Sequence, residues 1–329
     1  MFRSFKFSIF AIAVSITSLS AAARATFWRA PARQAGVTRE VAITFDDLPV
    51  AGVLPRDIAA SRELTRKLLA AVAAHHVPVI AFVNEDKLNA ADGAVEPARV
   101  DLLRRWLDAG AELGNHGYSH RDLNLVPLDQ FEQDVLKGER VLRPLLAERH
   151  TAPRFFRHPF LHTGRDLEKR ERFERFLGEH GYRVAPVTID NDEYVFAAAY
   201  DRSAARGDGA AAAKVAAAYV PYMEAKAEFF ERNSRELFGR EMRQILLVHA
   251  NMLNADRFDE LASMFERRGY RFIALERALE DPAFASSDTF VGSSGITWIH
   301  RWALTRKMPK SFYAGEPEVP GFVAEMAKP

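Results

Sequence analysis

The chain has 329 residues, of which 48% are hydrophobic and 27% are charged. This composition is ordinary for a globular protein, and the length suits one large α/β domain or two medium ones. The net charge of +1 does not favour a nucleic acid or an anionic membrane as partner. The absence of cysteine excludes disulfides, thiolate metal ligands and a cysteine nucleophile.

The first 25 residues differ from the rest of the chain. A basic start is followed by an apolar stretch, residues 8–20, which is too short to span a bilayer comfortably. Residues 23–25 read Ala-Arg-Ala and match a signal-peptidase site before Thr26. We therefore predict a signal peptide over residues 1–25 and an exported protein, periplasmic or secreted, with an uncleaved membrane anchor as the alternative. No later segment has the apolar length of a membrane span.

From residue 41 onward, short apolar runs alternate with amphipathic helical patterns. This alternation predicts a largely parallel α/β fold, and the number of units suits a barrel. The expected strands are residues 41–45, 78–84, 111–117, 153–159, 182–190, 245–250 and 270–275. The expected helices between the earlier strands are residues 57–77, 98–110, 128–146 and 167–181.

Two segments interrupt this rhythm. Residues 195–244 carry a long helical pattern between two expected strands, and we interpret them as a helical insertion. Residues 281–329 lack a clear period and end in a proline-rich stretch, which predicts an irregular C-terminal tail. The interpretation is therefore a single catalytic domain over residues 26–329, with its motif-bearing core at about residues 40–280.

Two adjacent acids end the first expected strand. Asp46 and Asp47 repel each other, so a positive group must lie beside them if both stay ionised in a poorly hydrated place. A polar turn that caps the strand is the simpler alternative. His116 and His120 are spaced i and i+4, which in a helical turn places both imidazoles on one side. Two histidines and one carboxylate form a common catalytic metal set, and the second carboxylate would then suit a general base.

Three further strand ends carry residues that could act in chemistry. Arg157 ends the strand at 153–159, and Asp190, Asp192 and Glu193 follow the strand at 182–190. His249 ends the strand at 245–250. Because the C-terminal ends of parallel barrel strands meet at one mouth, we expect these side chains to converge with the acids and histidines.

The motifs "TFDD", "HGYSH", "FRHPF", "DNDEY" and "LLVH" occur in this order. With them the chain resembles the polysaccharide deacetylase family, also called carbohydrate esterase family 4 or the NodB-homology domain, over about residues 40–280. The resemblance implies a distorted (β/α) barrel with about seven strands. It also implies a hydrolase that acts on carbon–nitrogen bonds other than peptide bonds.

The resemblance assigns the catalytic roles. Asp46 would be the general base and Arg157 would orient it. His249 would be the general acid, and either Asp190 or Glu193 would support it. These assignments match motif positions and leave the choice between the last two acids open.

The resemblance also assigns the binding positions. A divalent metal, usually zinc, would be held by Asp47, His116 and His120. Pro159 and the Phe160 backbone N–H would shape the oxyanion site. The two residues that would line the pocket for the acetyl methyl group are Tyr194 and Leu247.

The expected activity is removal of acetyl groups from N-acetylated amino sugars of a glycan. Hydrolysis of a glycan O-acetyl ester or of a non-sugar amide is an alternative, and so is a non-catalytic homologue that binds glycans. Leu48, Leu161 and Tyr194 depart from the family pattern, so the shape of the sugar groove and the identity of the substrate stay open. The sequence predicts no oligomeric state.

Overall fold

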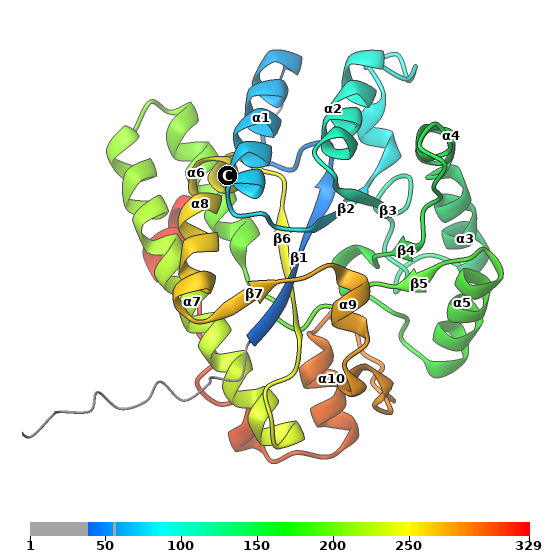
Figure 1. Cartoon of the computed structure of the whole chain (residues 1–329), viewed down its shortest axis with the longest axis vertical. Helices are drawn as coiled ribbons and strands as arrows, with labels where there is room; N and C mark the ends of the chain where they lie inside the picture. The colour runs from blue at the N-terminus through cyan, green and yellow to red at the C-terminus, as the bar shows by residue number, and fades with distance from the viewer. Residues whose placement is uncertain (1–38, 55–56) are drawn as a thin grey trace, which may run out of the picture. The chain divides into compact units, whose positions relative to one another are not determined.

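The computed structural model describes residues 39–54 and 57–329. The predicted signal peptide, residues 1–25, lies outside the described residues. Within them, seven strands form one parallel sheet with helices around it (Figure 1). The strands are β1 (Arg39–Leu48), β2 (Val79–Val83), β3 (Glu112–Asn115), β4 (Phe155–Phe156), β5 (Arg183–Val184), β6 (Gln244–His249) and β7 (Tyr270–Phe272).

The strand order closes the sheet into a distorted barrel. The order is β5-β4-β3-β2-β1-β6, and β7 pairs with the first residues of β1. The chain just after β5 returns to β6, because the N–H groups of Thr188 and Ile189 both donate to the carbonyl of Ile245 at 3.0 Å. Ile189 also forms a parallel bridge with Leu246. The predicted barrel of about seven strands is therefore confirmed, with its distortion at the short strands β4 and β5.

The helices follow from local sequence signals. In α1, the apolar residues Leu64, Leu68 and Val72 recur every four positions and are all buried. The Asp57 side chain begins this helix by accepting from the Ala60 N–H at 2.7 Å. The helices are α1 (Ile58–Ala74), α2 (Pro97–Asp108), α3 (Leu128–Lys137), α4 (Leu142–Ala147), α5 (Leu167–Glu179), α6 (Glu193–Ala205), α7 (Gly209–Phe238), α8 (Met252–Arg267), α9 (Leu275–Leu279), α10 (Trp298–Thr305) and α11 (Gly321–Met326).

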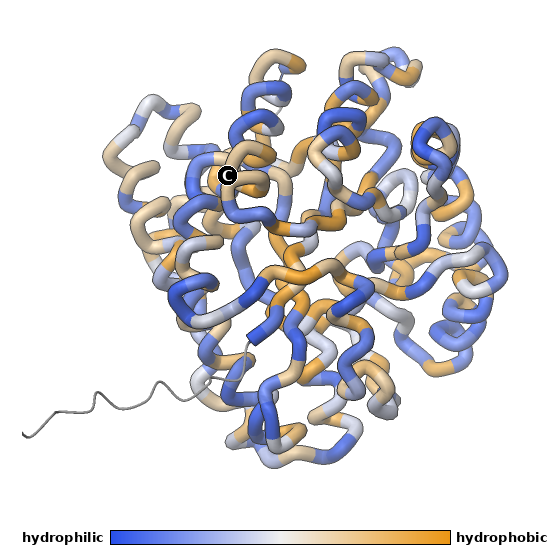
Figure 2. Tube along the Cα trace, viewed as in Figure 1, coloured by the Kyte–Doolittle hydropathy of each residue, from blue (hydrophilic) through white to orange (hydrophobic). Residues whose placement is uncertain are grey.

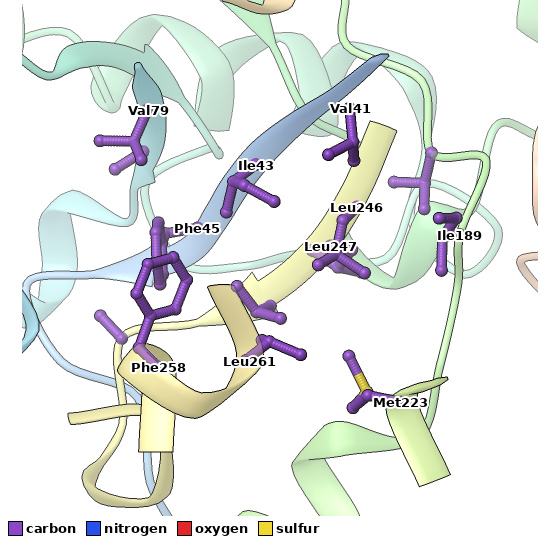
Figure 3. Packing of buried hydrophobic residues seen from close by; sticks show 14 of the residues in the cluster. Val41, Ile43, Phe45, Val79, Ile189, Met223, Leu246, Leu247, Phe258 and Leu261 are labelled. Carbon is purple, nitrogen blue, oxygen red and sulfur yellow. The ribbon is translucent and has the colours of Figure 1, made fainter. Parts of the chain in front are cut away.

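The central strand β1 separates two hydrophobic layers. Val41, Ile43 and Phe45 point to one face, where they join a buried cluster with Leu246, with α8 through Phe258, and with further residues of the helices (Figure 3). Hydropathy along the chain follows this arrangement, because the apolar residues gather at the central strands and the polar residues on the outer turns of the helices (Figure 2). Burial of this layer against the helices provides the main hydrophobic stabilisation of the fold.

The opposite face of β1 points into the barrel. Ala42 belongs to an inner cluster with residues of β2, β4 and β6. Thr44 and Asp46 follow at the alternate positions, as the two-residue period of a strand requires, and both are buried. The step from alanine to threonine to aspartate brings increasingly polar side chains toward the end of the strand. β1 therefore places its polar, potentially reactive side chains at the barrel mouth.

Three expected elements differ in the structure. The helix expected over residues 128–146 is two helices, because α3 ends at Lys137 and α4 begins only at Leu142. Gly138 allows the chain to pass close to another loop there, since a Cβ at this position would lie 2.8 Å from the carbonyl carbon of Gly117. The strands expected at 153–159 and 182–190 are reduced to two paired residues each.

The predicted insertion consists mainly of α6 and the 30-residue α7. Both helices pack against α8, so the three lie side by side along one side of the sheet (Figure 1). The C-terminal segment is more regular than expected, because it contains α10 and α11, which pack on α7 and α6, respectively. No helix within the described part of the chain has the length and apolar character to cross a membrane.

Candidate active site

Asp46 and Asp47 both reach the barrel mouth, although neighbouring residues of a regular strand point to opposite faces. The pairing of β1 with β2 shifts register between Phe45 and Leu48, which marks an irregularity in the strand. Asp47 has a positive φ of 70°, which is costly for a residue other than glycine. This local distortion turns the second carboxylate to the same side as the first. Both adjacent acids therefore point into the barrel mouth, and they do not form a simple polar turn.

The two histidines lie on the loop after β3, and the expected helical turn is absent. Their approach depends on backbone conformation instead, with φ of 78° at Gly117 and 52° at His120. The Asp134 carboxylate accepts from the N–H of Tyr118 at 2.9 Å and ties this loop to α3. The helical-turn argument for the spacing was wrong, although the two imidazoles do come together, with ring centroids 4.9 Å apart.

Asp47, His116 and His120 form a compact group of potential metal ligands. One ligand atom from each residue lies within 4.8 Å of the others. Oδ1 of Asp47 is 3.6 Å from Nε2 of His116 and 3.5 Å from Nε2 of His120. The same Oδ1 is buried and has no hydrogen-bond partner among the residues that the structure describes. A buried carboxylate oxygen that faces two imidazole nitrogens is suited to a shared divalent cation.

The protonation of this group also fits a cation. Burial lowers the pKa of both His116 and His120, so both imidazoles are neutral and can offer a lone pair. Nδ1 of His116 lies 2.7 Å from the carbonyl oxygen of Arg157, an interaction that leaves Nε2 for the ion. Burial opposes ionisation of Asp47, but the positive charge of Lys87 is the largest influence against it, and the pKa of that carboxyl lies below its usual range. The described residues thus fit a metal ion at this position.

Arg157 lies behind Asp46. The guanidinium is fully buried and donates from Nη1 to Oδ2 of Asp46 at 3.3 Å, and from Nη2 to Oγ1 of Thr44 at 2.9 Å. Burial raises the pKa of Asp46 to about 6, and the charge of Arg157 is the largest influence in the opposite direction. The carboxyl is therefore mainly ionised at neutral pH and still close enough to neutrality to accept a proton.

His249 is held by Glu193. Nδ1 of His249 lies 2.7 Å from Oε2 of Glu193, which is the first residue of α6. The amide of Asn254 donates to Oε1 of the same carboxylate at 2.8 Å, and the amide of Asn251 also donates to it. Burial lowers the pKa of His249, but the carboxylate of Glu193 outweighs burial and raises it to about 9. The imidazole is therefore cationic at neutral pH.

Asp190 does not take this position. Its Oδ1 accepts from the neighbouring Asn191 N–H at 2.9 Å, and burial raises its pKa to about 6. The sequence left two acids open as partners of the histidine, and the structure brings Glu193 to it. Asp190 faces the cleft instead.

These groups surround one cleft of about 650 Å³ at the barrel mouth. Both acids, His116, His120, Asp190 and His249 contribute to its wall. Leu247, Phe160 and Tyr194 also line it, the latter two with exposed side chains. Pro159 is buried, and the Phe160 and Leu161 that follow it have positive φ values of 57° and 56°.

The sequence reasoning missed several contributors to the site, among them one cation and two residues of the C-terminal segment. Lys87 Nζ lies 3.2 Å from Oδ2 of Asp47, so this oxygen is occupied while Oδ1 stays free. Lys87 follows the end of β2, and the rule that placed the other site residues at strand ends could have found it. Ser294 and Gly295 line the cleft from the C-terminal segment. No local signal in the sequence points to them.

The fold and site define a parallel barrel protein with a candidate metal centre flanked by a carboxyl and an imidazolium. The polysaccharide deacetylase family model matches residues 33–184. The resemblance seen in the motifs is therefore confirmed over this region, which is just under half of the chain.

Two curated relatives match part of the chain. The peptidoglycan-N-acetylglucosamine deacetylase of Bacillus cereus is 30% identical over 158 residues, which are 47% of this chain and 46% of the relative. The chitooligosaccharide deacetylase of Sinorhizobium fredii is 30% identical over 120 residues, which are 36% of this chain and 46% of the relative. The chain thus spans about half the length of the curated relatives it matches.

Among solved structures, a pseudoenzyme of the CE4 family from Bacillus anthracis is 14% identical, with a TM-score of 0.49. The alignment covers 74% of this chain and 66% of that one.

Proposed function

We propose that the chain is a metal-dependent hydrolase that removes acetyl groups from N-acetylated amino sugars of a glycan. The observation that carries the proposal is the arrangement around Asp47. This residue joins His116 and His120 in the candidate metal group, while Asp46 and His249 provide a carboxyl and an imidazolium in the same cleft. Amide hydrolysis needs a proton acceptor for water and a proton donor for the leaving amine, and these two groups suit the two tasks.

Asp47, His116 and His120 would hold the cation, and zinc suits a set of two imidazoles and one carboxylate. A cation held by these residues would polarise the acetyl carbonyl and would make a nearby water more acidic. Asp46 accepts a proton from the water while the water oxygen bonds to the carbonyl carbon. The buried Arg157 restrains the Asp46 carboxylate throughout this step.

The second half of the reaction requires a proton for the departing nitrogen. His249 donates it from Nε2, because Nδ1 is engaged by Glu193. The carbon–nitrogen bond then breaks, and the products are acetate and a free amine. The Phe160 N–H would donate to the oxyanion, and the exposed Phe160 and Tyr194 rings would contact the sugar.

The names of the relatives suggest the first substrates to test. Acetate release from oligomers of N-acetylglucosamine should require a divalent cation, should cease after chelation and should return when zinc is added. Zinc content of the purified protein, measured beside the rates, would show whether zinc is the ion that is bound. Acetate release from O-acetylated sugars alone would favour the esterase alternative. Acetate release from simple amides alone would favour the non-sugar amidase alternative. Binding of the oligomers without any acetate release would favour the non-catalytic homologue.

A further inference from the structure

A second cleft lies next to the candidate active site. Its volume is about 630 Å³, nearly equal to the 650 Å³ of the catalytic cleft, and both are within the usual range for small-molecule sites. Asp192 lines both clefts, so the two clefts are neighbours. The mechanism proposed above does not use this second cleft.

The polar wall of the second cleft is held in place by a buried lysine. Lys226 of α7 is 4% exposed, and its Nζ lies 2.7 Å from Oε1 of Glu316 and 3.9 Å from Oδ2 of Asp192. The Tyr222 hydroxyl donates to the same Asp192 oxygen at 2.9 Å. Both carboxylates nevertheless keep part of their surface open, because the side chains of Asp192 and Glu316 are 41% and 35% exposed. They are thus fixed acceptors at the edge of the cleft.

The rest of the lining is partly apolar. Tyr313, Pro317 and Val319 come from the C-terminal segment, and Val195 comes from α6. Carboxylates that accept from hydroxyl groups, beside an aromatic ring and aliphatic side chains that pack on C–H faces, form a surface suited to a pyranose ring. Because Lys226 already holds the two carboxylates in place, few side-chain rotamers have to become ordered when a sugar binds. This lowers the entropic cost of binding.

We propose that this cleft is an accessory subsite that binds a sugar residue of the same glycan chain, beside the residue that is deacetylated. The reaction in this proposal rests on the proposed function, whereas the binding of the additional sugar residue rests on the second cleft. The subsite is formed by α6, α7 and the C-terminal segment, which lie outside the 33–184 region matched by the family model. It makes oligosaccharides better ligands than single acetylated sugars.

Ala324 offers a way to block the subsite. It lines the second cleft, is exposed and lies within α11, where a tryptophan can be accommodated without burial in the core. Ala324→Trp therefore fills the cleft and leaves the catalytic groups untouched. Glu325→Trp is the matched control, because this neighbouring exposed residue on the same helix does not line the cleft. Equal thermal unfolding midpoints of the two variants and the parent would show that the fold is retained.

Two measurements test the proposal. In the zinc-loaded full chain, Ala324→Trp should lower kcat/KM for a hexamer of N-acetylglucosamine on the order of tenfold, the size of a lost subsite contact. The same variant should leave the turnover of 4-nitrophenyl acetate unchanged, and Glu325→Trp should change neither. Calorimetric titration with the hexamer and with the monomer should show tighter binding of the hexamer by the parent and loss of that preference in Ala324→Trp.

The outcomes separate this inference from the proposed function. Acetate release with the same kcat/KM per residue for all chain lengths would overturn the subsite and leave the deacetylase standing. Length-dependent binding that Ala324→Trp removes, without acetate release, would overturn the reaction and leave the subsite standing. An equal effect of Ala324→Trp and Glu325→Trp would overturn the subsite, and so would an absence of length-dependent binding in the parent.

Discussion

Oε2 of Glu193 lies 2.7 Å from Nδ1 of His249, and these two residues are 56 positions apart. The first comes from the beginning of α6 and the second from the end of β6. The contact fixes the imidazole plane and directs Nε2 toward the cleft. It also keeps the imidazole charged in a buried place, where burial alone would favour the neutral form.

Glu193→Gln should therefore shift the pH dependence of the reaction. The substitution removes the negative charge that raises the pKa of His249 to about 9, while the effect of burial stays and lowers it. The alkaline limb of kcat/KM should move from near pH 9 toward the ordinary histidine pKa of 6.5 or below it, so activity at pH 8 should fall. A pH–rate profile measures this. Asp190→Asn is the control and should leave the alkaline limb in place, whereas an unmoved limb in Glu193→Gln would contradict the pairing.

Asp47→Asn and Asp46→Asn should separate metal binding from proton transfer. Asp47→Asn replaces the carboxylate that faces both histidines by a neutral amide, a poorer ligand for a divalent ion, so zinc content and turnover should fall together. Asp46→Asn should retain the metal but lose the proton acceptor, which costs on the order of 10²–10⁴-fold in rate. Elemental analysis beside acetate-release rates distinguishes the two. Loss of zinc in Asp46→Asn with retention in Asp47→Asn would reverse the assigned roles.

Gly295→Ala should disturb the loop that carries Phe160. A Cβ at this position would lie 1.9 Å from the Phe160 carbonyl oxygen and 2.8 Å from Cβ of Leu161, so the loop or the C-terminal segment has to shift. A displacement of about 1 Å near the reacting groups can lower the rate on the order of 10²-fold. Zinc content should stay largely unchanged, because the three candidate ligands lie on β1 and on the loop after β3, outside the two segments that have to shift.

The control for this prediction is Gly178→Ala in α5, where an added Cβ meets no atom within 4 Å. This variant should keep full activity and an equal or higher unfolding midpoint, since alanine favours a helix over glycine. Full activity in Gly295→Ala would show that the close approach to Phe160 does not position the loop for catalysis.

Glu85→Ala should destabilise the fold without a direct effect on the site. The buried Glu85 carboxyl accepts from the backbone N–H groups of Val141 and Leu142 at 2.9 and 2.6 Å, which are at the beginning of α4. Its removal leaves two donors without their acceptor and should cost about 2–3 kcal/mol in the free energy of unfolding. Denaturant titration measures this loss. Glu85→Gln keeps one acceptor oxygen and should lose less; equal losses would show that packing, rather than hydrogen bonding, is responsible.

The export of the chain, which we propose from residues 1–25, predicts a mature N-terminus. Protein recovered from the native cells should begin at Thr26 and should be found outside the cytoplasm. N-terminal sequencing of the fractionated protein measures this directly. An intact Met1 on protein from the cytoplasmic fraction would contradict the prediction.

The strand ends were predictable from the sequence because a buried strand has a simple signature. Asp46, Arg157 and His249 each follow a short apolar run, and the parallel fold brings such ends to one mouth. The conformation between His116 and His120 was not predictable in this way. The i and i+4 spacing occurs in helices and in loops, and the positive φ at His120 depends on contacts of this loop with α3.

The choice between Asp190 and Glu193 needed the beginning of α6. Three positions separate these acids, and only the start of the helix at Glu193 turns that side chain toward β6. The contribution of Ser294 and Gly295 needed the tertiary structure altogether. They lie far from the other site residues in the sequence, and no period or motif marks them.

Because Gly295 of the C-terminal segment lies close to Phe160 in the wall of the cleft, the site can be completed only late in the synthesis of the chain. A ribosome completes the two acids and the candidate metal ligands early, and His249 much later. The wall at Ser294 and Gly295 follows only after a further forty or so residues. A nascent chain that ends at residue 184, where the family match stops, already holds Asp47, His116 and His120. It has neither the imidazolium nor the closing wall, so the complete site forms only after nearly all of the chain has been synthesised.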